Sequence, residues 1–522
     1  MTDPGLAEPL SSSARSNYVA AARRVMSLPL ADEALVFALA LAARLYVVLG
    51  SGGLLGNYGY DASVYYAAGD GLAHGRLPYR DFVFLHPPGI VVVLAPFAWL
   101  GRLTSDHTGF VTASLAFTVL GALNAVLVVL VAKRMGVQRR GTLLGGVFYA
   151  LWLGAVGAEF LTRLEPLGNF FVLCGLLAFL TARTSSNRYL ALVTGAAFAT
   201  AASVKIWWAV LLLVVLAWHV VARRPRRELV LAVGGAAATL LVLDGPFFLL
   251  APSQMWHMVV TEQLGRYPDQ TTTATRLLQL STFNRLVPQP PHAVVLLVAA
   301  AFVLVVLALV ATAWSNRSAR LVAALSVIQV VVLVVAPSWF TFYPDYLAPA
   351  LALTVAAALG PARTRTALAA RLSRWAWLPV AYASAVAVLV FAVHQGDSVR
   401  AFPGARLARA VAQQRCVMSD SPMALIELDV LSRDFANGCR NWVDVTGRTY
   451  GPDAAPLDAA GVPVGRPENQ KWQRDLRAYL LSGNAVIIIR ADGTGPSAAT
   501  WATVRRGGVL AAADGYVVYR TN

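Results

Sequence analysis

The stretch that decides the fold is residues 57–89, NYGYDASVYYAAGDGLAHGRLPYRDFVFLHPPG, which is polar and aromatic and follows the first long apolar segment. Val64, Tyr65, Ala68 and Leu72 recur at helical spacing, which predicts a short helix lying on a membrane surface. Asp61 stands near the N-terminus of this helix, where the helix dipole favours an ionised carboxylate. Ionisable side chains concentrated directly after a first membrane span indicate a functional site.

The composition indicates a polytopic α-helical membrane protein. Of the 522 residues, 57% are hydrophobic and only 13% are charged, whereas a soluble domain carries about 25% charged residues. The net charge of +16 comes largely from arginines that cluster in short loops between apolar runs. That distribution sets membrane orientation, so the basic charge does not predict nucleic-acid binding.

Eleven apolar runs predict about eleven transmembrane helices. They are residues 31–49, 110–131, 142–158, 166–180, 189–203, 206–221, 229–250, 292–313, 321–335, 346–359 and 377–393. A further apolar run at 90–100 is too short to cross, and we expect it to be re-entrant or interfacial. This alternation places every dense arginine cluster on the cytoplasmic side, with the N-terminus inside and the C-terminus outside.

The chain therefore divides into three parts. Residues 1–30 form a cytoplasmic N-terminal segment, and 31–393 form the membrane part with outer loops at 50–108 and 251–291. Residues 397–522 are mixed in polarity and predict a small extracytoplasmic α+β domain, with strands at 485–490 and 516–520 and a helix near 472–481. Cys416 and Cys439 lie in this domain, where we expect a disulfide; two free buried thiols are the alternative.

The predicted topology brings polar residues that are distant in sequence to one membrane face. They are Asp61 and its neighbours, Glu159, Arg163, Glu165, Lys205, Asp244, His257, Glu262, Arg266, Tyr343, Asp345 and Tyr346. Any one of them could snorkel or cap a helix, and Glu262 and Arg266, four residues apart, could form a local ion pair. Carboxylates snorkel poorly, however, so the whole set indicates a shared site.

Several short motifs resemble a known superfamily. An Asp in a Tyr-rich helical start is followed by a His-Pro-Pro-Gly turn at 86–89, then by Leu-Glu-Pro at 164–166, Lys205, and Tyr-Pro-Asp-Tyr-Leu-Ala-Pro at 343–349. Over 31–393 this pattern resembles the GT-C glycosyltransferases that use polyprenyl-phosphate sugars. Their members include protein O-mannosyltransferases, lipid A aminoarabinose transferases and actinobacterial mannosyl- and arabinofuranosyltransferases. Two positions depart from the superfamily pattern. The superfamily often has Lys or Tyr where this chain has His86, and it often has His where this chain has Asp345.

The resemblance implies an enzyme of the bacterial inner membrane that transfers mannose or arabinofuranose from a polyprenyl-phosphate donor to a cell-envelope glycan, lipid or protein. Asp61 matches the catalytic first-loop Asp and is the expected general base, and Glu165 matches the second acidic position. Lys205, Arg163, Arg266 and His86 are candidates for the donor phosphate, although His86 could instead stabilise its turn. Further site candidates are Tyr60, Tyr65, Asp244, Glu262, Tyr343, Asp345 and Tyr346.

Other chemistries are less consistent with the sequence. No His, Cys or Asp cluster has metal-ligand spacing, so we expect no metal or other cofactor, and there is no P-loop or dinucleotide fingerprint. A flippase of lipid-linked sugars and a non-catalytic envelope assembly protein are the alternatives to an enzyme. Aromatic residues around Trp442 could stack on a glycan, but we expect them to form the core of the C-terminal domain.

Overall fold

A computed structural model describes residues 30–50, 59–185, 187–360, 377–398, 402–450, 454–459, 461–490 and 494–521. The expected N-terminal segment before Leu30, the positions 51–58 and the arginine cluster at 363–374 lie outside the described residues.

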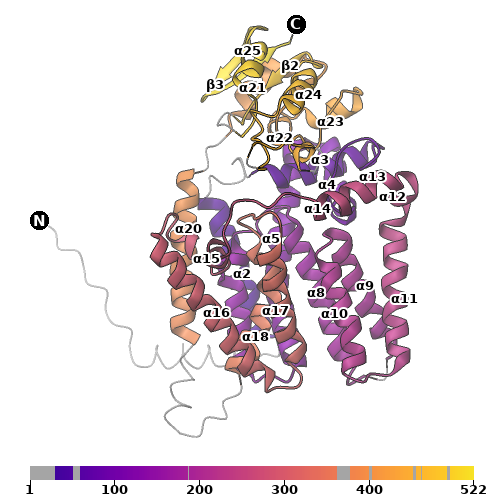
Figure 1. Ribbon diagram of the computed structural model, residues 1–522, viewed down its shortest axis with the longest axis vertical. Helices are drawn as coiled ribbons and strands as arrows, with labels where there is room; N and C mark the ends of the chain where they lie inside the picture. Colours follow the sequence, from indigo (N-terminus) through magenta and orange to yellow (C-terminus); the bar gives the residue numbers. More distant parts are fainter. Residues whose placement is uncertain are drawn as a thin grey trace, which may run out of the picture.

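The larger part of the described chain is a bundle of roughly parallel and antiparallel helices (Figure 1). The helices that correspond to predicted spans are α2 (Ala31–Gly50), α5 (Asp106–Arg134), α6 (Arg139–Leu151), α8 (Leu164–Thr181), α9 (Tyr189–Val204), α10 (Trp208–Val221), α11 (Arg226–Leu243), α16 (His292–Trp314), α17 (Arg320–Val335), α18 (Pro344–Leu359) and α20 (Trp377–Ser398). The other helices of this part are α3 (Tyr60–Ala73), α4 (Gly89–Leu103), α7 (Leu153–Val156), α12 (Gly245–Leu250), α13 (Pro252–Trp256), α14 (Glu262–Leu264) and α15 (Thr273–Leu280).

Each of the eleven predicted spans corresponds to helix, but two of them are broken. The run at 142–158 divides into α6 and α7, because Trp152 adopts an extended backbone between them. The run at 229–250 divides into α11 and α12 at Asp244. Pro246 lies in the first turn of α12, where a missing backbone N–H is tolerated, whereas inside one continuous helix it would remove a hydrogen bond.

Four described helices are long and apolar enough to cross a membrane by length and composition: α2, α5, α8 and α16. The number of eleven crossings therefore stays a prediction. Helix α4 has 15 residues and is about 22 Å long, less than the roughly 30 Å of a bilayer core. It packs along α3 and α5. The turns that join α8 to α9, α10 to α11 and α16 to α17 lie at the end of the bundle far from the C-terminal segment (Figure 1). The arginines in these turns are therefore at the same end of the bundle.

A buried polar network ties three helices of the bundle, α2, α5 and α6, to the turn that follows α7. Arg44 of α2 forms an ion pair with Glu159, which also accepts hydrogen bonds from Tyr149 Oη at 2.7 Å and Asn124 Nδ2 at 2.9 Å. All four side chains are fully buried. Glu159 was expected among the residues of a shared site, and the structure instead satisfies its carboxylate inside the bundle, where an unpaired charge would be costly.

The C-terminal segment folds as α+β and matches the sequence pattern. Its helices are α21 (Gly404–Val411), α22 (Pro422–Glu427), α23 (Leu431–Ala436), α24 (Gln470–Leu480) and α25 (Ala498–Arg505). Its strands, β1 (Val417–Ser419), β2 (Ala485–Ile487), β3 (Val509–Ala513) and β4 (Tyr516–Arg520), form one sheet in the order β1-β2-β4-β3. Asp514 and Gly515 both have positive φ and make the two-residue turn between β3 and β4.

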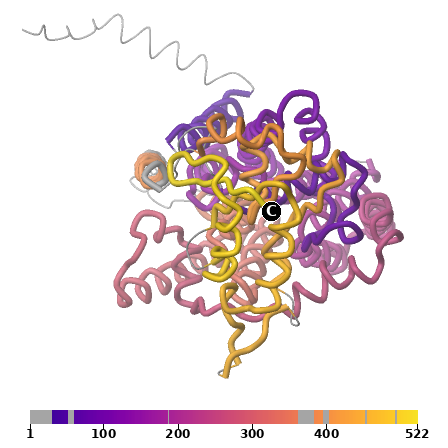
Figure 2. Tube along the Cα trace, turned by 90° about the horizontal axis from the view of Figure 1, so that it is seen from above, coloured from indigo at the N-terminus to yellow at the C-terminus, as the bar shows by residue number. Residues whose placement is uncertain are grey.

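This C-terminal segment lies over one end of the bundle and covers α3 (Figures 1 and 2). Ser432 donates from its hydroxyl to Asp70 Oδ1 at 3.0 Å, and its backbone N–H bonds the Asp106 carboxylate at 3.1 Å. On its other side α3 meets α4 so closely that a Cβ at Gly69 would lie 3.0 Å from the Leu94 backbone. The predicted helix at 61–72 is confirmed, but residues 62–71 are all buried, so it does not lie open on a membrane surface.

Cys416 and Cys439 form a disulfide with a Cα–Cα distance of 5.7 Å, as the sequence predicted. The bridge closes a loop with a sequence separation of 23 residues and ties β1 to the chain that follows α23. Closing a loop of this length removes conformational freedom from the unfolded chain.

We expect the double substitution Cys416→Ser and Cys439→Ser to lower the free energy of unfolding of the C-terminal segment by about 3 kcal/mol. Urea titration followed by tryptophan fluorescence measures the change, and Cys174→Ser, at a free cysteine, is the control. Peptide mass spectrometry without reduction checks the bond itself. Two alkylatable thiols in protein from the native membrane would contradict the prediction.

Candidate active site

The candidate active site is a small cavity between the end of the bundle and the C-terminal segment. Gly59, with φ of 76°, turns the chain into α3 and places Asp61 in the first helical turn, half-buried at the cavity wall. The cavity is lined by Tyr60, Asp61, Val64, Tyr65, Leu85, His86, Lys205, Arg266, Phe340, Phe342, Tyr343, Asp444, Thr446 and Tyr450. Residues from distant parts of the sequence therefore meet around one carboxylate.

Lys205 presents its ammonium group to this cavity at the end of α9. Its Nζ lies 2.8 Å from Glu165 Oε1, 3.9 Å from the centre of the Trp207 ring and 4.2 Å from the centre of the Tyr343 ring. Glu165 itself does not line the cavity. The second acidic position of the sequence motif therefore holds Lys205 in place, and two aromatic faces stabilise the same cation.

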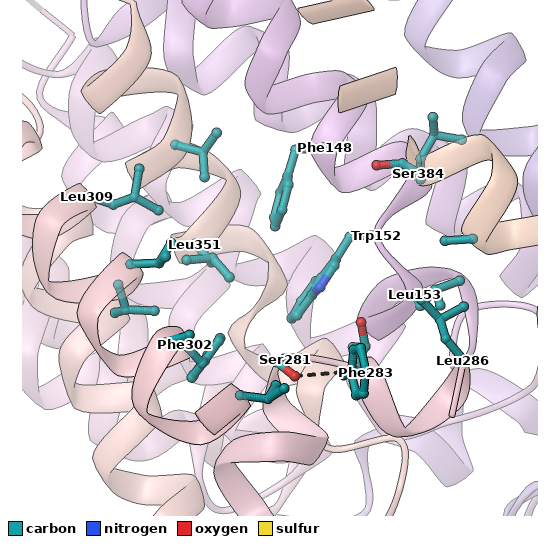
Figure 3. Close-up of a pocket in the computed structure, with 18 residues that line it drawn as sticks. Phe148, Trp152, Leu153, Ser281, Phe283, Leu286, Phe302, Leu309, Leu351 and Ser384 are labelled. Atoms are coloured by element: carbon teal, nitrogen blue, oxygen red, sulfur yellow. Dashed lines mark hydrogen bonds between the residues drawn. The ribbon is translucent and has the colours of Figure 1, made fainter. Parts of the chain in front are cut away.

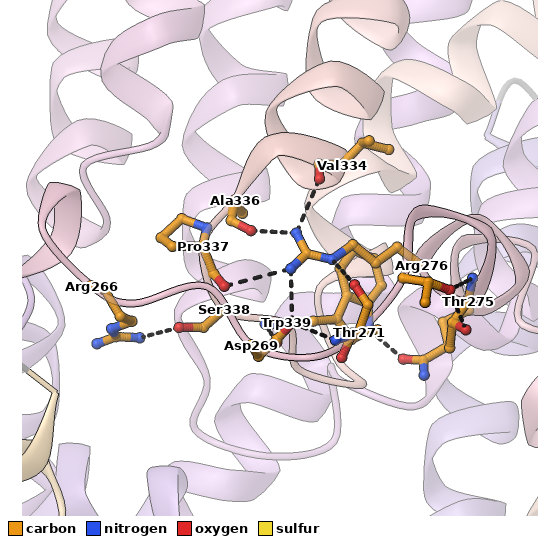
Figure 4. Close-up of polar contacts among 12 residues, drawn as sticks. Arg266, Asp269, Thr271, Thr275, Arg276, Val334, Ala336, Pro337, Ser338 and Trp339 are labelled. Carbon is orange, nitrogen blue, oxygen red and sulfur yellow. Dashed lines mark hydrogen bonds and ion pairs between the residues drawn. The ribbon is translucent and has the colours of Figure 1, made fainter. Parts of the chain in front are cut away.

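Two arginines add positive charge near Asp61. The Arg163 guanidinium lies 4.1 Å from the centre of the Phe342 ring, and its Nε and Nη1 have no hydrogen-bond partner among the described residues. Arg266 lies over the Tyr450 ring at 4.2 Å and donates to Ser338 Oγ at 3.3 Å, as Figure 4 shows for the Ser338 contact. Its Nε is also buried without a described partner. Buried donors without partners are costly, so these guanidinium groups have donors available for an anionic ligand, although only Arg266 of the two lines the cavity.

His86 closes the cavity beside these cations. Its Nε2 lies 3.4 Å from Tyr65 Oη, and its ring packs edge-on against Tyr65 and Phe84. Burial, together with the charges of Lys205 and Arg266, lowers the pKa of His86 well below its ordinary value. At neutral pH the imidazole is uncharged, so His86 can contribute a hydrogen bond but not the positive charge that the sequence allowed.

The environment of Asp61 makes its carboxylate more basic than usual. Burial raises the pKa of Asp61, the nearby Arg163 charge opposes that rise, and Asp444 and Glu165 add to it. A carboxylate with a raised pKa binds a proton more readily than an ordinary aspartate, which is the property that a general base needs. The cavity thus combines a base with cations that can stabilise a developing negative charge.

The C-terminal segment supplies part of this site, which the sequence did not predict. Tyr60 Oη donates to Asp444 Oδ1 at 2.8 Å and accepts from the Thr446 backbone N–H at 2.9 Å. The Arg490 guanidinium lies 3.7 Å from the centre of the Tyr60 ring. These contacts join the residue next to Asp61 to a part of the chain more than 380 positions away. The sequence had drawn attention to this region only through residues 442–447, whose tryptophan was considered for stacking on a glycan.

The expected core role of the nearby aromatics is confirmed. Trp442 is buried and stacks on Tyr479, with ring centres 4.6 Å apart and planes nearly parallel.

Several residues that line the Asp61 cavity were not predicted from the sequence, among them Phe340, Phe342, Thr446 and Tyr450. Rings and hydroxyls such as these carry no sequence signal that separates a site from a core.

Besides Glu165, five of the site candidates do not line the cavity, namely Arg163, Asp244, Glu262, Asp345 and Tyr346. Asp244 accepts a hydrogen bond from Ser203, Asp345 Oδ1 accepts from Asn169 Nδ2 at 3.1 Å, and Tyr346 Oη donates to the Trp207 carbonyl at 3.1 Å. These three support the surrounding helices. Glu262 pairs with His257 at 3.3 Å instead of with Arg266. The π-helix His257–Thr261 explains this correction, because it brings residues five apart onto one face.

A second cavity, of about 450 Å³, lies inside the bundle among α6, α16, α18 and α20 (Figure 3). Phe148 and Trp152 stack with ring centres 5.5 Å apart and point toward it with Phe302 on the other side. None of the described residues that line it is ionisable. The lining of this cavity therefore offers no general acid or base. No group of three or more His, Cys, Asp and Glu among the described residues could hold a metal ion.

Comparisons with known proteins agree with this architecture. Residues 84–337 match the family described as Glycosyltransferase family 87. The fold is similar to ArnT from Cupriavidus metallidurans bound to undecaprenyl phosphate, with 16% identity and a TM-score of 0.60 over 95% of this chain and 99% of that one. It is also similar to the oligosaccharyltransferase AglB of Archaeoglobus fulgidus in complex with an inhibitory peptide and a dolichol-phosphate, with 14% identity and a TM-score of 0.53 over 87% and 69%. Among curated proteins there is no match.

The contact between Tyr60 and the C-terminal segment leads to a first prediction about the site. Tyr60→Phe removes the hydroxyl that bridges Asp444 and the Thr446 N–H, and we expect it to lower the local opening free energy there by about 1–2 kcal/mol. Hydrogen exchange of a peptide that contains Thr446 should then accelerate roughly 5–30-fold. Tyr65→Phe is the control, because the Tyr65 hydroxyl contacts only the His86 ring. Equal exchange in both variants would contradict the proposed link.

Proposed function

We propose that the chain is a glycosyltransferase of the GT-C superfamily and that it transfers a sugar from a polyprenyl-phosphate carrier to a hydroxyl of a cell-envelope acceptor. Asp61 is the general base of this reaction. Mannose and arabinofuranose, which the sequence resemblance implies, are the sugars to test first.

The observation that carries the proposal is the meeting of Asp61 with Lys205 and Arg266 around one cavity. Transfer from a sugar phosphate needs a base for the incoming hydroxyl and positive charge for the departing phosphate. Asp61 can supply the base, and Lys205 and Arg266 can supply the positive charge. Charge-assisted hydrogen bonds to phosphate are among the strongest that proteins make. The lipid carrier is supported by two structures of similar fold, which hold undecaprenyl phosphate and dolichol-phosphate.

The reaction assigns a role to each group. The acceptor hydroxyl gives its proton to the Asp61 carboxylate as its oxygen forms a bond to the anomeric carbon. The bond between that carbon and the phosphate oxygen breaks, and its electron pair leaves with the polyprenyl phosphate. Lys205 and Arg266 stabilise the charge that develops on the departing oxygen, because they already face the cavity and need no reorganisation.

The neighbouring residues position these groups. Glu165 and the rings of Trp207 and Tyr343 fix the Lys205 ammonium. Arg163 stands close enough to Asp61 to favour its ionised form, and the neutral His86 offers a hydrogen bond to phosphate or sugar. Tyr60 fixes the start of α3 through Asp444 and Thr446.

We propose that this end of the protein faces outward from a bacterial inner membrane. The arginine-rich turns share the far end of the bundle (Figure 1), and positive loops favour the cytoplasm. The cavity and the C-terminal segment would then meet both the lipid-linked donor and the envelope acceptor on the extracytoplasmic side.

Asp61→Asn tests the base. We expect kcat to fall by about 10²–10⁴-fold with little change in donor affinity, because the amide keeps the shape of the side chain but cannot accept the proton. Purified full-length protein, a synthetic polyprenyl-phosphate sugar and a soluble saccharide acceptor suffice for the assay. Asp81→Asn, at an exposed carboxylate of the same loop, is the matched control. Transfer by Asp61→Asn near the wild-type rate would remove Asp61 from the mechanism.

The pH profile gives a second readout of the same group. Burial raises the pKa of Asp61, and only the ionised form accepts a proton, so activity is lost as pH falls through that raised value. The acid limb of kcat/KM should therefore lie at higher pH than an ordinary aspartate gives. If the apparent pKa of the acid limb equals that of a solvent-exposed carboxyl group, the assignment of Asp61 as the base is contradicted.

Lys205→Met should act differently from Asp61→Asn. Loss of a cation that contacts phosphate should raise the KM for the donor about 10–100-fold, and it should slow transfer as well if the contact tightens while phosphate departs. Because Glu165 would then be buried without its partner, thermal unfolding of Lys205→Met and of Lys205→Met with Glu165→Gln separates stability from binding. A donor KM unchanged in both folded variants would exclude Lys205 from the phosphate site.

Cysteine labelling tests the orientation. In a Cys174→Ser background, cysteine at the exposed Gln270 should react with a membrane-impermeant maleimide in intact cells, and cysteine at the exposed Gln138 should react only after lysis. Gln138 precedes α6 in an arginine-rich turn, so the two positions report opposite ends of the bundle. The reverse pattern would invert the proposed topology.

A further inference from the structure

A larger groove, of about 510 Å³, opens beside the Asp61 cavity between the bundle and the C-terminal segment. Its lining includes Tyr267, Asp269, Trp339, Thr449, Val462, Val464, Arg466, Asn469 and Thr494. Arg266, Phe340 and Tyr450 line both the groove and the Asp61 cavity, so the two spaces adjoin. A ligand in the groove would therefore reach the base without crossing the bundle.

One wall of the groove is fixed by a buried arginine (Figure 4). Arg276 donates to the backbone carbonyls of Val334 and Thr271 at 3.0 and 3.2 Å and forms an ion pair with Asp269 at 2.8 Å. Asp269 in turn accepts a hydrogen bond from the Trp339 backbone N–H. The loop that carries Trp339 is thus tied to α15 and α17, and its indole ring is held at the groove wall.

The opposite wall belongs to the C-terminal segment and centres on Tyr450. Arg466 Nη2 donates to the Tyr450 hydroxyl at 3.0 Å, and its Nε donates to Thr449 Oγ1 at 3.1 Å. Arg266 covers the Tyr450 ring at 4.2 Å, and its buried Nε has no hydrogen-bond partner among the described residues. The aromatic wall is therefore rigid, and an unused donor stands at the passage to the Asp61 cavity.

The groove combines flat rings with hydroxyl, amide and guanidinium groups at their edges. Pyranose and furanose units present the matching surface, because their C–H faces lie on aromatic rings while their hydroxyls form hydrogen bonds around the edge. A prenyl chain would leave those polar edges without partners. The volume of the groove lies within the range of specific small-ligand sites.

We infer that this groove binds the saccharide of the acceptor, with the reacting hydroxyl passing Arg266 and Tyr450 to reach Asp61. The inference rests on the proposed transfer reaction and adds the acceptor class to it. The C-terminal segment then selects the acceptor, while the bundle holds the donor.

Val464→Trp tests the groove, because Val464 lines it but not the Asp61 cavity. The acceptors are alkyl mono-, di- and trimannosides and the matching arabinofuranosides. For the wild type, KM should fall about tenfold from the monosaccharide to the trisaccharide. In Val464→Trp this length advantage should disappear, while the KM of the donor remains unchanged because Val464 does not line the Asp61 cavity.

Leu457→Trp is the matched control, since Leu457 is exposed on the same segment and lines neither space. Val462→Trp is a second blocking variant, so that a folding defect in one variant is recognised by thermal unfolding. A length advantage retained in both blocking variants, or absent from the wild type, would overturn the inference.

Saccharide binding is also measured without donor, by saturation-transfer NMR with the two trisaccharides and the full-length protein. Wild type and Leu457→Trp should bind one of them with Kd in the millimolar range or tighter, and the blocking variants should bind at least tenfold more weakly. Absence of binding by the wild type would overturn the inference. Failure of the wild type to release polyprenyl phosphate from any donor would instead refute the proposed reaction, whatever the groove binds.

Discussion

The site depends on the confinement of α3 between α4 and the C-terminal segment. Gly69 allows α3 to approach the backbone at Leu94, and Ser432 bonds Asp70 from the other side. Tyr60, at the first turn, is bonded to both Asp444 and Thr446. A helix held on both faces cannot rotate or slide, so the carboxylate of Asp61 keeps one position relative to the cations of the bundle. Such fixed geometry is what transfer between two bound substrates requires.

Buried charged side chains inside the bundle differ in their hydrogen bonding from those near Asp61. Inside the bundle, Glu159 is satisfied by Arg44, Tyr149 and Asn124, so this ion pair holds helices together and leaves little capacity for a ligand. At the Asp61 cavity, by contrast, Arg163 and Arg266 keep donor atoms without described partners, and one oxygen of Glu165 is likewise unused. These unused donor atoms are available to an anionic ligand, because a charge-assisted hydrogen bond would offset the cost of their burial.

The C-terminal segment is part of the site as well as its cover. It brings Asp444, Thr446 and Tyr450 to the cavity and Arg466 to the adjoining groove. One small cluster, in which Trp442 stacks on Tyr479, belongs to this segment alone, and the bond between Cys416 and Cys439 also stabilises it. Other buried residues of the segment, such as Leu425 and Val443, pack in the same hydrophobic cluster as the bundle. This shared core fixes the segment against the bundle, so its side chains keep their position at the cavity of Asp61.

The sequence by itself determined the helical architecture and the location of the chemistry along the chain. Apolar runs of nearly the right lengths become the helices of the bundle, since burying backbone polar groups in an apolar medium requires internal hydrogen bonds. Asp61, Lys205, Arg266 and Tyr343 were predicted for the site from their place on one membrane face and from the superfamily resemblance, and all of them line one cavity. The strands 485–487 and 516–520 and the disulfide also followed from local pattern and compartment.

Only the tertiary structure decided which of these polar residues meet. Glu159, Asp244 and Asp345 were candidates for the site like Asp61, yet packing places each beside a neighbour that donates a hydrogen bond to it, away from the cavity wall. The π-helical turn that pairs His257 with Glu262 and the bond from Tyr60 to Asp444 join residues that no periodicity relates. Periodicity along the chain fixes which face of an element a residue occupies, whereas contacts between distant elements depend on how those faces pack, and that packing is a property of the whole fold.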